Sequence, residues 1–381
     1  LFYQTPLYSK STTFDNFNSK NLSKYFSAII ALENKNNTEA LDFFNSSKIL
    51  IQNHNPYLKK YVYSLILENK VSDAINIIKK NKSKKNSNFF EAKLLLVLDN
   101  LKKNKFEEAY IYLTKGEDFS QNGRLNSAIT EILRQYIYVF KEKKLAEDKK
   151  SFGQLSLISE TFQRCYLNDD STITFFNDLF SNSSEDHTRY VYFYLSHLIE
   201  NDRYEAAKKV VKEINYINTT LLLAQGKSWI EKEKPRKINE FFSCRNHNDL
   251  ISEFLFLVSN LYSSQDDFKK SNFYLNLSNY LNPKFVFNLS LVVENQYLNN
   301  ALRPLTNQWS DHVKDLGHWS SVNLHSQKSF HKTYIHTPLS SSKLKRLFVV
   351  ISDALRYEAA HDFVDRLNSQ SSKSWDAKIN A

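Results

Sequence analysis

The sequence predicts a mainly α-helical chain, in which an array of helical hairpins precedes the first strand and helix of an α/β domain. Three observations predict this fold class. A small residue recurs at spacings of 34 and 35 residues, short polar triplets precede it at a matching distance, and one apolar run late in the chain leads into an acidic residue. Apolar residues make up 41% of the 381 residues and aromatic residues 14%, which is enough to form buried cores, so a disordered protein is excluded.

The recurring small residue is followed four positions later by a large apolar residue. Ala40, Ala74 and Ala109 hold this place in three successive units, and Ala207 and Ser271 hold it in two later ones. Two antiparallel helices approach closely only where one of them has a small side chain, and the apolar residue one turn later fills the adjoining groove. The pattern therefore predicts a helix, a short turn and a second helix around each of these residues.

Polar triplets mark the turns that we expect inside these units, at Glu33–Lys35, Glu68–Lys70, Lys103–Lys105 and Glu200–Asp202. A single unit of this size cannot bury its apolar face, so neighbouring units must stack. We therefore predict an α-solenoid over residues 20–300, although residues 117–186 fit the pattern only loosely. An irregular α-helical domain is the alternative interpretation.

The period near 34 residues resembles that of tetratricopeptide repeats (TPR), and Asn282-Pro283 resembles the proline that often closes such a unit. This resemblance implies a concave surface that binds a partner protein or peptide. The many Lys, Asn and Tyr residues favour an acidic or polar partner segment.

The run Leu347–Arg356, LFVVISDALR, predicts a strand that is buried on both faces, and a helical pattern follows it from about Tyr357. Ligands of open α/β sheets gather beyond the carboxyl ends of the strands. Asp353 is therefore a candidate metal or substrate ligand. The alternative is that Asp353 only caps the following helix, as many Asp residues do.

The stretch from about Ala301 resembles the PglZ family, metal-dependent hydrolases of the alkaline phosphatase superfamily that are associated with bacterial phage defence of the BREX type, and three segments carry the resemblance. The segments are LFVVISDALRYEAA from Leu347, NNALRPLTNQWSDHV around Trp309 and SQKSFHKTYI from Ser326. The resemblance covers roughly the last fifth of the chain. It implies a connector over 301–342, the start of a phosphatase-like domain over 343–381, and Asp353 as a ligand of a divalent metal ion, by resemblance zinc.

In that family a Ser or Thr nucleophile and further Asp and His ligands would come after this point, and no such segment is present in the sequence. One carboxylate alone holds a divalent cation weakly, because a catalytic site needs several ligands. We therefore expect no catalytic residue within this chain, no cofactor unless the domain is complete, and no activity of the chain by itself.

Two functions follow from these patterns. The first is a PglZ-type phosphatase-like protein of a phage-defence system, whose helical repeats bind other subunits of the defence complex. The second is a TPR scaffold for protein–protein interaction, to which the tail is joined by a fusion or assembly artefact. A shift in composition near residue 300 motivates the second, because six of the 10 His and three of the 4 Trp residues follow it.

The charge distribution gives no sign of a nucleic-acid partner. The formal net charge is +10, and the one dense basic run, Lys79–Asn86, lies between two helical patterns without interleaved aromatic residues. We interpret this run as a solvated loop.

Cys165 and Cys244 are the two cysteines, and neither their spacing nor a nearby His cluster indicates a zinc site. We interpret them as thiols of a reducing compartment or as simply buried residues. No apolar run is long enough to span a bilayer and LFYQTPLYSK does not resemble a signal peptide, so we expect a cytoplasmic protein. Export stays open, because the first residue is Leu and the chain contains no Met.

Overall fold

The computed structural model describes residues 18–52, 54–81, 87–114, 123–181, 188–214, 220–289 and 302–316, with residues 332, 336, 337, 340, 363–366, 368 and 369. The chain divides into two compact units, Leu1–Ala301 and Leu302–Ala381. The functional assignment of residues 20–300, 301–342 and 343–381 stays a prediction.

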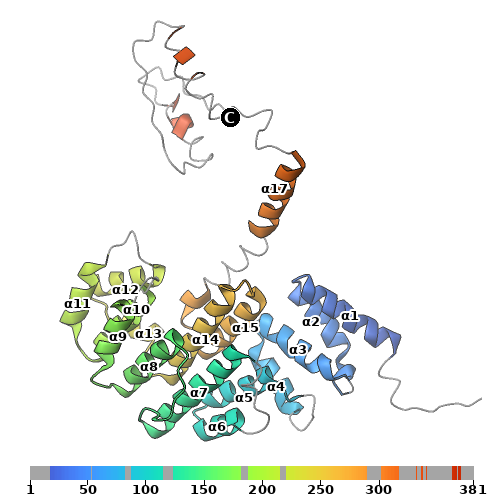
Figure 1. The fold of residues 1–381 in the computed structure, drawn as a ribbon, viewed down its shortest axis with the longest axis horizontal. Helices are drawn as coiled ribbons and strands as arrows, with labels where there is room; N and C mark the ends of the chain where they lie inside the picture. Colours follow the sequence, from blue (N-terminus) through green and yellow to red (C-terminus); the bar gives the residue numbers. More distant parts are fainter. Residues whose placement is uncertain are drawn as a thin grey trace, which may run out of the picture. The chain divides into compact units, whose positions relative to one another are not determined.

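Helices form nearly all of the described part of the first unit (Figure 1). They are α1 (Ser19–Glu33), α2 (Asn37–Ser46), α3 (Asn55–Leu67), α4 (Val71–Lys80), α5 (Phe90–Lys102), α6 (Phe106–Thr114), α7 (Arg124–Glu142), α8 (Gln154–Leu167), α9 (Thr172–Ser181), α10 (Thr188–Glu200), α11 (Tyr204–Glu213), α12 (Leu221–Glu231), α13 (Lys237–Phe241), α14 (His247–Ser263) and α15 (Phe268–Leu281), with 3-10 turns η2 (Lys48–Gln52) and η6 (Val286–Leu289). The prediction of a mainly α-helical chain is confirmed. The predicted strand at Leu347–Arg356 lies outside the described residues.

The predicted turns are present inside the hairpins α1–α2, α3–α4, α5–α6 and α10–α11. One residue of each turn has a left-handed backbone, for example Asn69 with φ 57° and Asn104 with φ 60°. In the α5–α6 turn the N–H of Lys105 donates to the carbonyl of Asn100 at 2.9 Å, and the N–H of Asn104 donates to that of Leu101 at 3.0 Å. This pair of bonds satisfies carbonyls at a helix end and reverses the chain in three residues.

The predicted small residues are buried within their hairpins. The side chains at all five positions are buried, with exposed fractions of 0 to 1%: Ala40, Ala74, Ala109, Ala207 and Ser271. The apolar residue four positions later is also buried in four of the units and half-buried in the α5–α6 unit. The packing role that the pattern predicts is therefore confirmed.

The last hairpin, α14–α15, returns to the first helices of the unit. Asn276 on α15 donates from its amide to the carbonyl of Ile66 on α3 at 2.8 Å, and the Phe273 ring stacks on Tyr63 with centroids 4.7 Å apart. The imidazole Nε2 of His247 lies 2.9 Å from the carbonyl oxygen of Leu101 on α5. In an open solenoid each repeat contacts only its neighbours. These contacts across more than a hundred residues do not confirm an open array.

The described part of the second unit is mainly one helix, α17 (Arg303–Leu316). Leu305 and Trp309 on this helix have exposed fractions of 65% and 56%. Within the described residues of both units, no helix combines the length and the apolar character that crossing a bilayer requires.

Candidate functional site: a buried disulfide and its polar surroundings

The predicted metal ligand, Asp353, lies outside the described residues, so its role stays a prediction. Among the residues that the structure does describe, no group of three or more His, Cys, Asp or Glu side chains is placed to hold a metal ion. Of the basic run Lys79–Asn86, the described residues are Lys79 to Asn81. Lys79 pairs with the carboxylate of Asp99 at 2.6 Å, which is a packing contact between α4 and α5.

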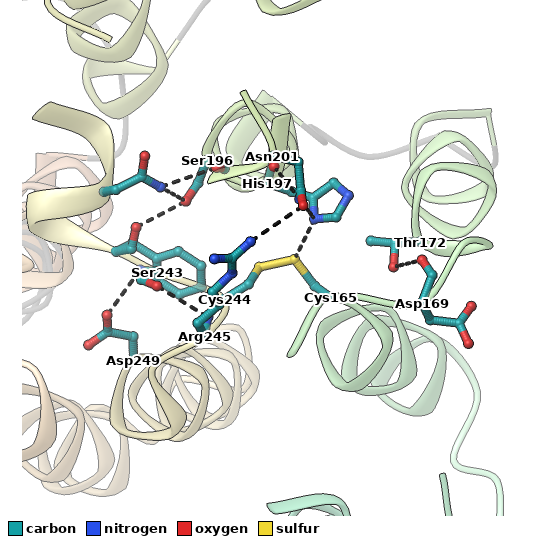
Figure 2. Close-up of a disulfide and its surroundings, with 12 residues drawn as sticks. Cys165, Asp169, Thr172, Ser196, His197, Asn201, Ser243, Cys244, Arg245 and Asp249 are labelled. Carbon is teal, nitrogen blue, oxygen red and sulfur yellow. Dashed lines mark hydrogen bonds between the residues drawn. A yellow bond between two sulfur atoms is a disulfide. The ribbon is translucent and has the colours of Figure 1, made fainter. Parts of the chain in front are cut away.

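The two cysteines are bonded to each other, which corrects the interpretation that they are separate thiols. Cys165 lies near the end of α8 and Cys244 in the loop between α13 and α14, and their sulfur atoms are 2.02 Å apart (Figure 2). Burial was the correct part of the prediction, because the exposed fractions are 2% and 0%. A spacing of 79 residues carries no motif, so only the fold brings the two residues together.

His197 on α10 lies directly beside the disulfide. Its Nδ1 atom is 3.4 Å from Sγ of Cys165 and 3.4 Å from the amide nitrogen of Asn201. Burial, with smaller contributions from the Arg203 and Arg245 guanidinium groups, lowers the pKa of His197 to about 4. The imidazole is therefore neutral near pH 7, with one ring nitrogen able to donate and the other able to accept.

The loop that carries Cys244 is held from three sides. Arg245 donates to the carbonyl of Glu200 at 3.2 Å, at the end of α10. The N–H of Ser243 donates to the carboxylate of Asp249 at 3.0 Å, in the first turn of α14, and the hydroxyl of Ser196 donates to the carbonyl of Phe242 at 3.0 Å. The disulfide adds the link to α8, so the loop joins three helices (Figure 2).

Two acidic residues beside this loop, Asp249 and Glu200, have raised pKa values. Burial raises the pKa of Asp249 to about 7, although the Ser243 N–H and the Asn246 amide act against the rise. Burial also raises the pKa of Glu200. The disulfide beside these groups is itself shielded from solvent, since the exposed fractions of Cys165 and Cys244 are 2% and 0%.

A second polar link joins α10 to α14. The guanidinium of Arg189 donates to both carboxylate oxygens of Glu253 at 2.8 and 2.6 Å, and the Glu253 side chain has an exposed fraction of 1%. The same guanidinium lies over the ring of Phe256, with its carbon 3.8 Å from the centroid. Stacking and a two-pronged ion pair together fix the distance between the two helices.

A separate cavity of about 270 Å³ lies where α15 meets α3, α5 and α7. Aromatic rings dominate its lining, with Glu91, Arg124 and Lys270 as the charged side chains. Lys270 pairs with Asp267 at 2.9 Å and Glu91 with Lys59 at 3.2 Å. Two of the three charged side chains of the lining, Glu91 and Lys270, are therefore already paired within the chain.

A comparison with known proteins finds one partial similarity. A segment of 80 residues, or 20% of this chain, is 34% identical to the alkaline phosphatase-like protein PglZ of Bacillus cereus (strain H3081.97) and covers 9% of that protein. The chain thus spans a small fraction of the length of this relative. No family profile matches the chain, and no solved structure matches it. The similarity supports a partial relation to PglZ, and nothing in the comparisons supports the tetratricopeptide family.

Proposed function

We propose that this chain is a helical interaction region joined to the first part of the catalytic domain of a PglZ-type phosphatase-like protein, which acts in phage defence of the BREX type in the bacterial cytoplasm. The observation that carries this proposal is the 34% identity to PglZ over 80 residues. The second unit, Leu302–Ala381, has the same length as that similarity and contains all but the first three residues of the segments that resemble the family.

Asp353 is the residue that we assign to the chemistry. In the complete domain it would be one ligand of a divalent metal ion, zinc by family resemblance, which would polarise a phosphoryl or related ester oxygen and activate a nucleophile. The nucleophile and the other ligands would be supplied by a longer protein. A lone carboxylate does not hold the metal in a catalytic geometry, so the 381-residue chain alone is inactive.

The helical unit, Leu1–Ala301, is the part that we assign to binding. Its helices form one continuous apolar core, which suits a rigid platform for a partner protein or peptide better than a mobile linker. Exposed lysines such as Lys35, Lys70 and Lys80 favour a polar or acidic segment of that partner. Subunits of the same defence complex are the partners that we expect.

The experiment compares two proteins in a phosphoester hydrolysis assay with zinc. One is the 381-residue chain, and the other is expressed from the source gene with all the coding sequence that continues its frame. We expect turnover of p-nitrophenyl phosphate or a phosphodiester analogue only by the longer protein, and its loss in Asp353→Asn. Asp365→Asn, which changes an exposed carboxylate on the same segment, is the matched control. Zinc-dependent turnover that survives Asp353→Asn would contradict the assignment.

A further inference from the structure

The Cys165–Cys244 bond links helix α8 to the loop between α13 and α14. Between Cys165 and Cys244 the chain forms α9 to α13, and the bond closes this 79-residue segment onto α8. The loop that carries Cys244 leads directly into α14, the first helix of the hairpin that closes onto α3 and α5. A change at this bond therefore acts first on the loop ahead of α14.

We propose that Cys165–Cys244 is a reversible redox lock, which fixes the loop ahead of α14 to α8 in its disulfide form and releases that loop when a dithiol reductant cleaves it. Protein dithiols of the thioredoxin class are the reductants that the proposal requires. Disulfides are rare in reducing compartments unless they cycle, so the lock reconciles this bond with the cytoplasmic location that we propose for the protein.

The reaction balances as a thiol–disulfide exchange. A thiolate of the reductant attacks Sγ of Cys244 and displaces Sγ of Cys165 as a thiolate, and the second thiol of the reductant then displaces Sγ of Cys244. Two electrons and two protons pass to the chain, which gains two thiols, while the reductant becomes a disulfide. Oxidised glutathione reverses the reaction and is itself reduced.

The surroundings favour Cys165 as the sulfur that leaves first. His197 Nδ1, at 3.4 Å, can donate a hydrogen bond to the new thiolate in one tautomer of the neutral imidazole. The Arg203 and Arg245 guanidinium groups disfavour a proton on His197, and the same positive charges favour a thiolate beside it. His197 is a positioning residue in this scheme, because the exchange itself occurs between sulfur atoms.

Access to the sulfur atoms requires the loop to open. Both cysteines are buried, so the reductant must wait until the segment from Phe242 to Asn246 separates from α10. The contact between Arg245 and the end of α10 is the most exposed of the bonds that hold the loop. Cleavage of the chain after Arg245 therefore reports how often this loop opens.

The test is a redox titration of the folded chain in glutathione buffers, with free thiols counted by alkylation and mass spectrometry. We expect one two-electron transition within the range of the buffers, with no alkylation on the oxidised side and two labelled cysteines on the reduced side. On the reduced side, tryptic cleavage after Arg245 should be about tenfold faster. Cleavage after Arg236, whose side chain has an exposed fraction of 82%, should keep its rate and serves as the control.

Two outcomes would overturn the proposal. One is a pair that stays fully reduced or fully oxidised in every buffer while the chain is folded. The other is a complete transition without any change in cleavage after Arg245. A Cys165→Ser/Cys244→Ser variant should be cut at the fast rate in all buffers, and the titration of the natural chain decides the matter if this variant does not fold.

The role of His197 has its own readout, the rate of reduction relative to the rate of opening. His197→Leu removes the donor and should slow reduction about tenfold, because hydrogen bonds to charged groups are worth about 1.5 kcal/mol or more. His197→Asn keeps an N–H donor and should restore most of the rate. If both variants change reduction and cleavage after Arg245 in parallel, His197 only packs against the disulfide.

Discussion

The hairpins α1–α6 and the segment α7–α13 are held together in different ways. In the first region every hairpin has the same three-residue reversal and a buried alanine at the helix contact. In the second region only the hairpin α10–α11 repeats this reversal, and two long-range links join the region to the rest: the disulfide and the ion pair of Arg189 with Glu253. Local sequence shapes the first region, whereas single distant contacts shape the second.

The difference has a physical cause. A turn with one left-handed residue and two backbone hydrogen bonds depends only on residues next to each other, so repeating its sequence repeats its structure. A buried ion pair or a disulfide requires two partners that are far apart in the chain. Removing one member of a buried ion pair leaves the charge of the other member buried without compensation. We therefore expect substitutions in α7–α13 to have the larger effects.

The largest effect should come from Arg189→Met. It leaves the Glu253 carboxylate, which has an exposed fraction of 1%, buried without its cation, and should lower the free energy of unfolding by about 4 kcal/mol. Urea unfolding measures the loss, and Arg189→Met/Glu253→Leu should recover most of it. Arg236→Met is the control, since its ion pair with Asp202 is exposed and should contribute little to the free energy of unfolding. Equal effects of the two single variants would show that the buried ion pair contributes no more to stability than an exposed one.

A smaller loss is expected for Ala74→Leu in the hairpin α3–α4. Ala74 has an exposed fraction of 0%, so a larger side chain forces the two helices apart and should cost about 2 kcal/mol. Asn76→Leu places the same side chain on the exposed face of α4 and should be close to neutral. Thermal unfolding of both variants measures the contrast, and a neutral Ala74→Leu would show that the small residue does not set the helix spacing.

The turn residue Asn104 should show a still smaller effect. Its φ of 60° suits Asn or Gly, whereas a β-branched side chain is strained there, so Asn104→Val should lower the free energy of unfolding by about 1.5 kcal/mol. Asn104→Gly should leave it nearly unchanged. Chemical unfolding of the pair tests whether the left-handed turn, rather than the side-chain contacts of Asn104, defines this hairpin.

The pH dependence of Asp249 should give the smallest effect when it is measured over a single pH unit. Its pKa in the folded chain is about 7, above its usual value of 3.8, so the unfolded chain loses this proton first as pH rises. The contribution of Asp249 to the free energy of unfolding is therefore fully present below pH 3.8 and is lost as pH rises through 7. Between these two values the loss should be about 1.4 kcal/mol for each pH unit, and about 4 kcal/mol over the whole shift is its upper limit. Asp249→Asn should remove this dependence between pH 4 and 8, and an unchanged pH profile would contradict the assignment.

Much of the hairpin region could be predicted from the sequence. The left-handed residues Asn69 and Asn104 fall inside predicted turns, and Ala40 and Ala74 are buried at the predicted contacts. These features repeat within about 35 residues, so they leave a periodic signal in the chain. The return of α14–α15 onto α3 leaves no such signal, because Asn276 and Phe273 meet partners more than 200 residues away.

The candidate site was harder to predict. Cys165 and Cys244 are separated by 79 residues, and His197, which lies beside them, is one of several isolated histidines in the sequence. Cys165, Cys244 and His197 come together only because α8 and α10 pack against the loop before α14. Asp353 is the opposite case, since its local sequence indicates a role, while its place in space lies outside the described residues.

The most direct test of the proposed function is to sequence the source DNA from codon 290 through codon 310 and onward beyond codon 381. A continuous frame that runs on into a Ser or Thr nucleophile with further Asp and His ligands is the predicted result. A frame that breaks near codon 300 would contradict it, because the helical unit and the PglZ-like segment would then come from different genes.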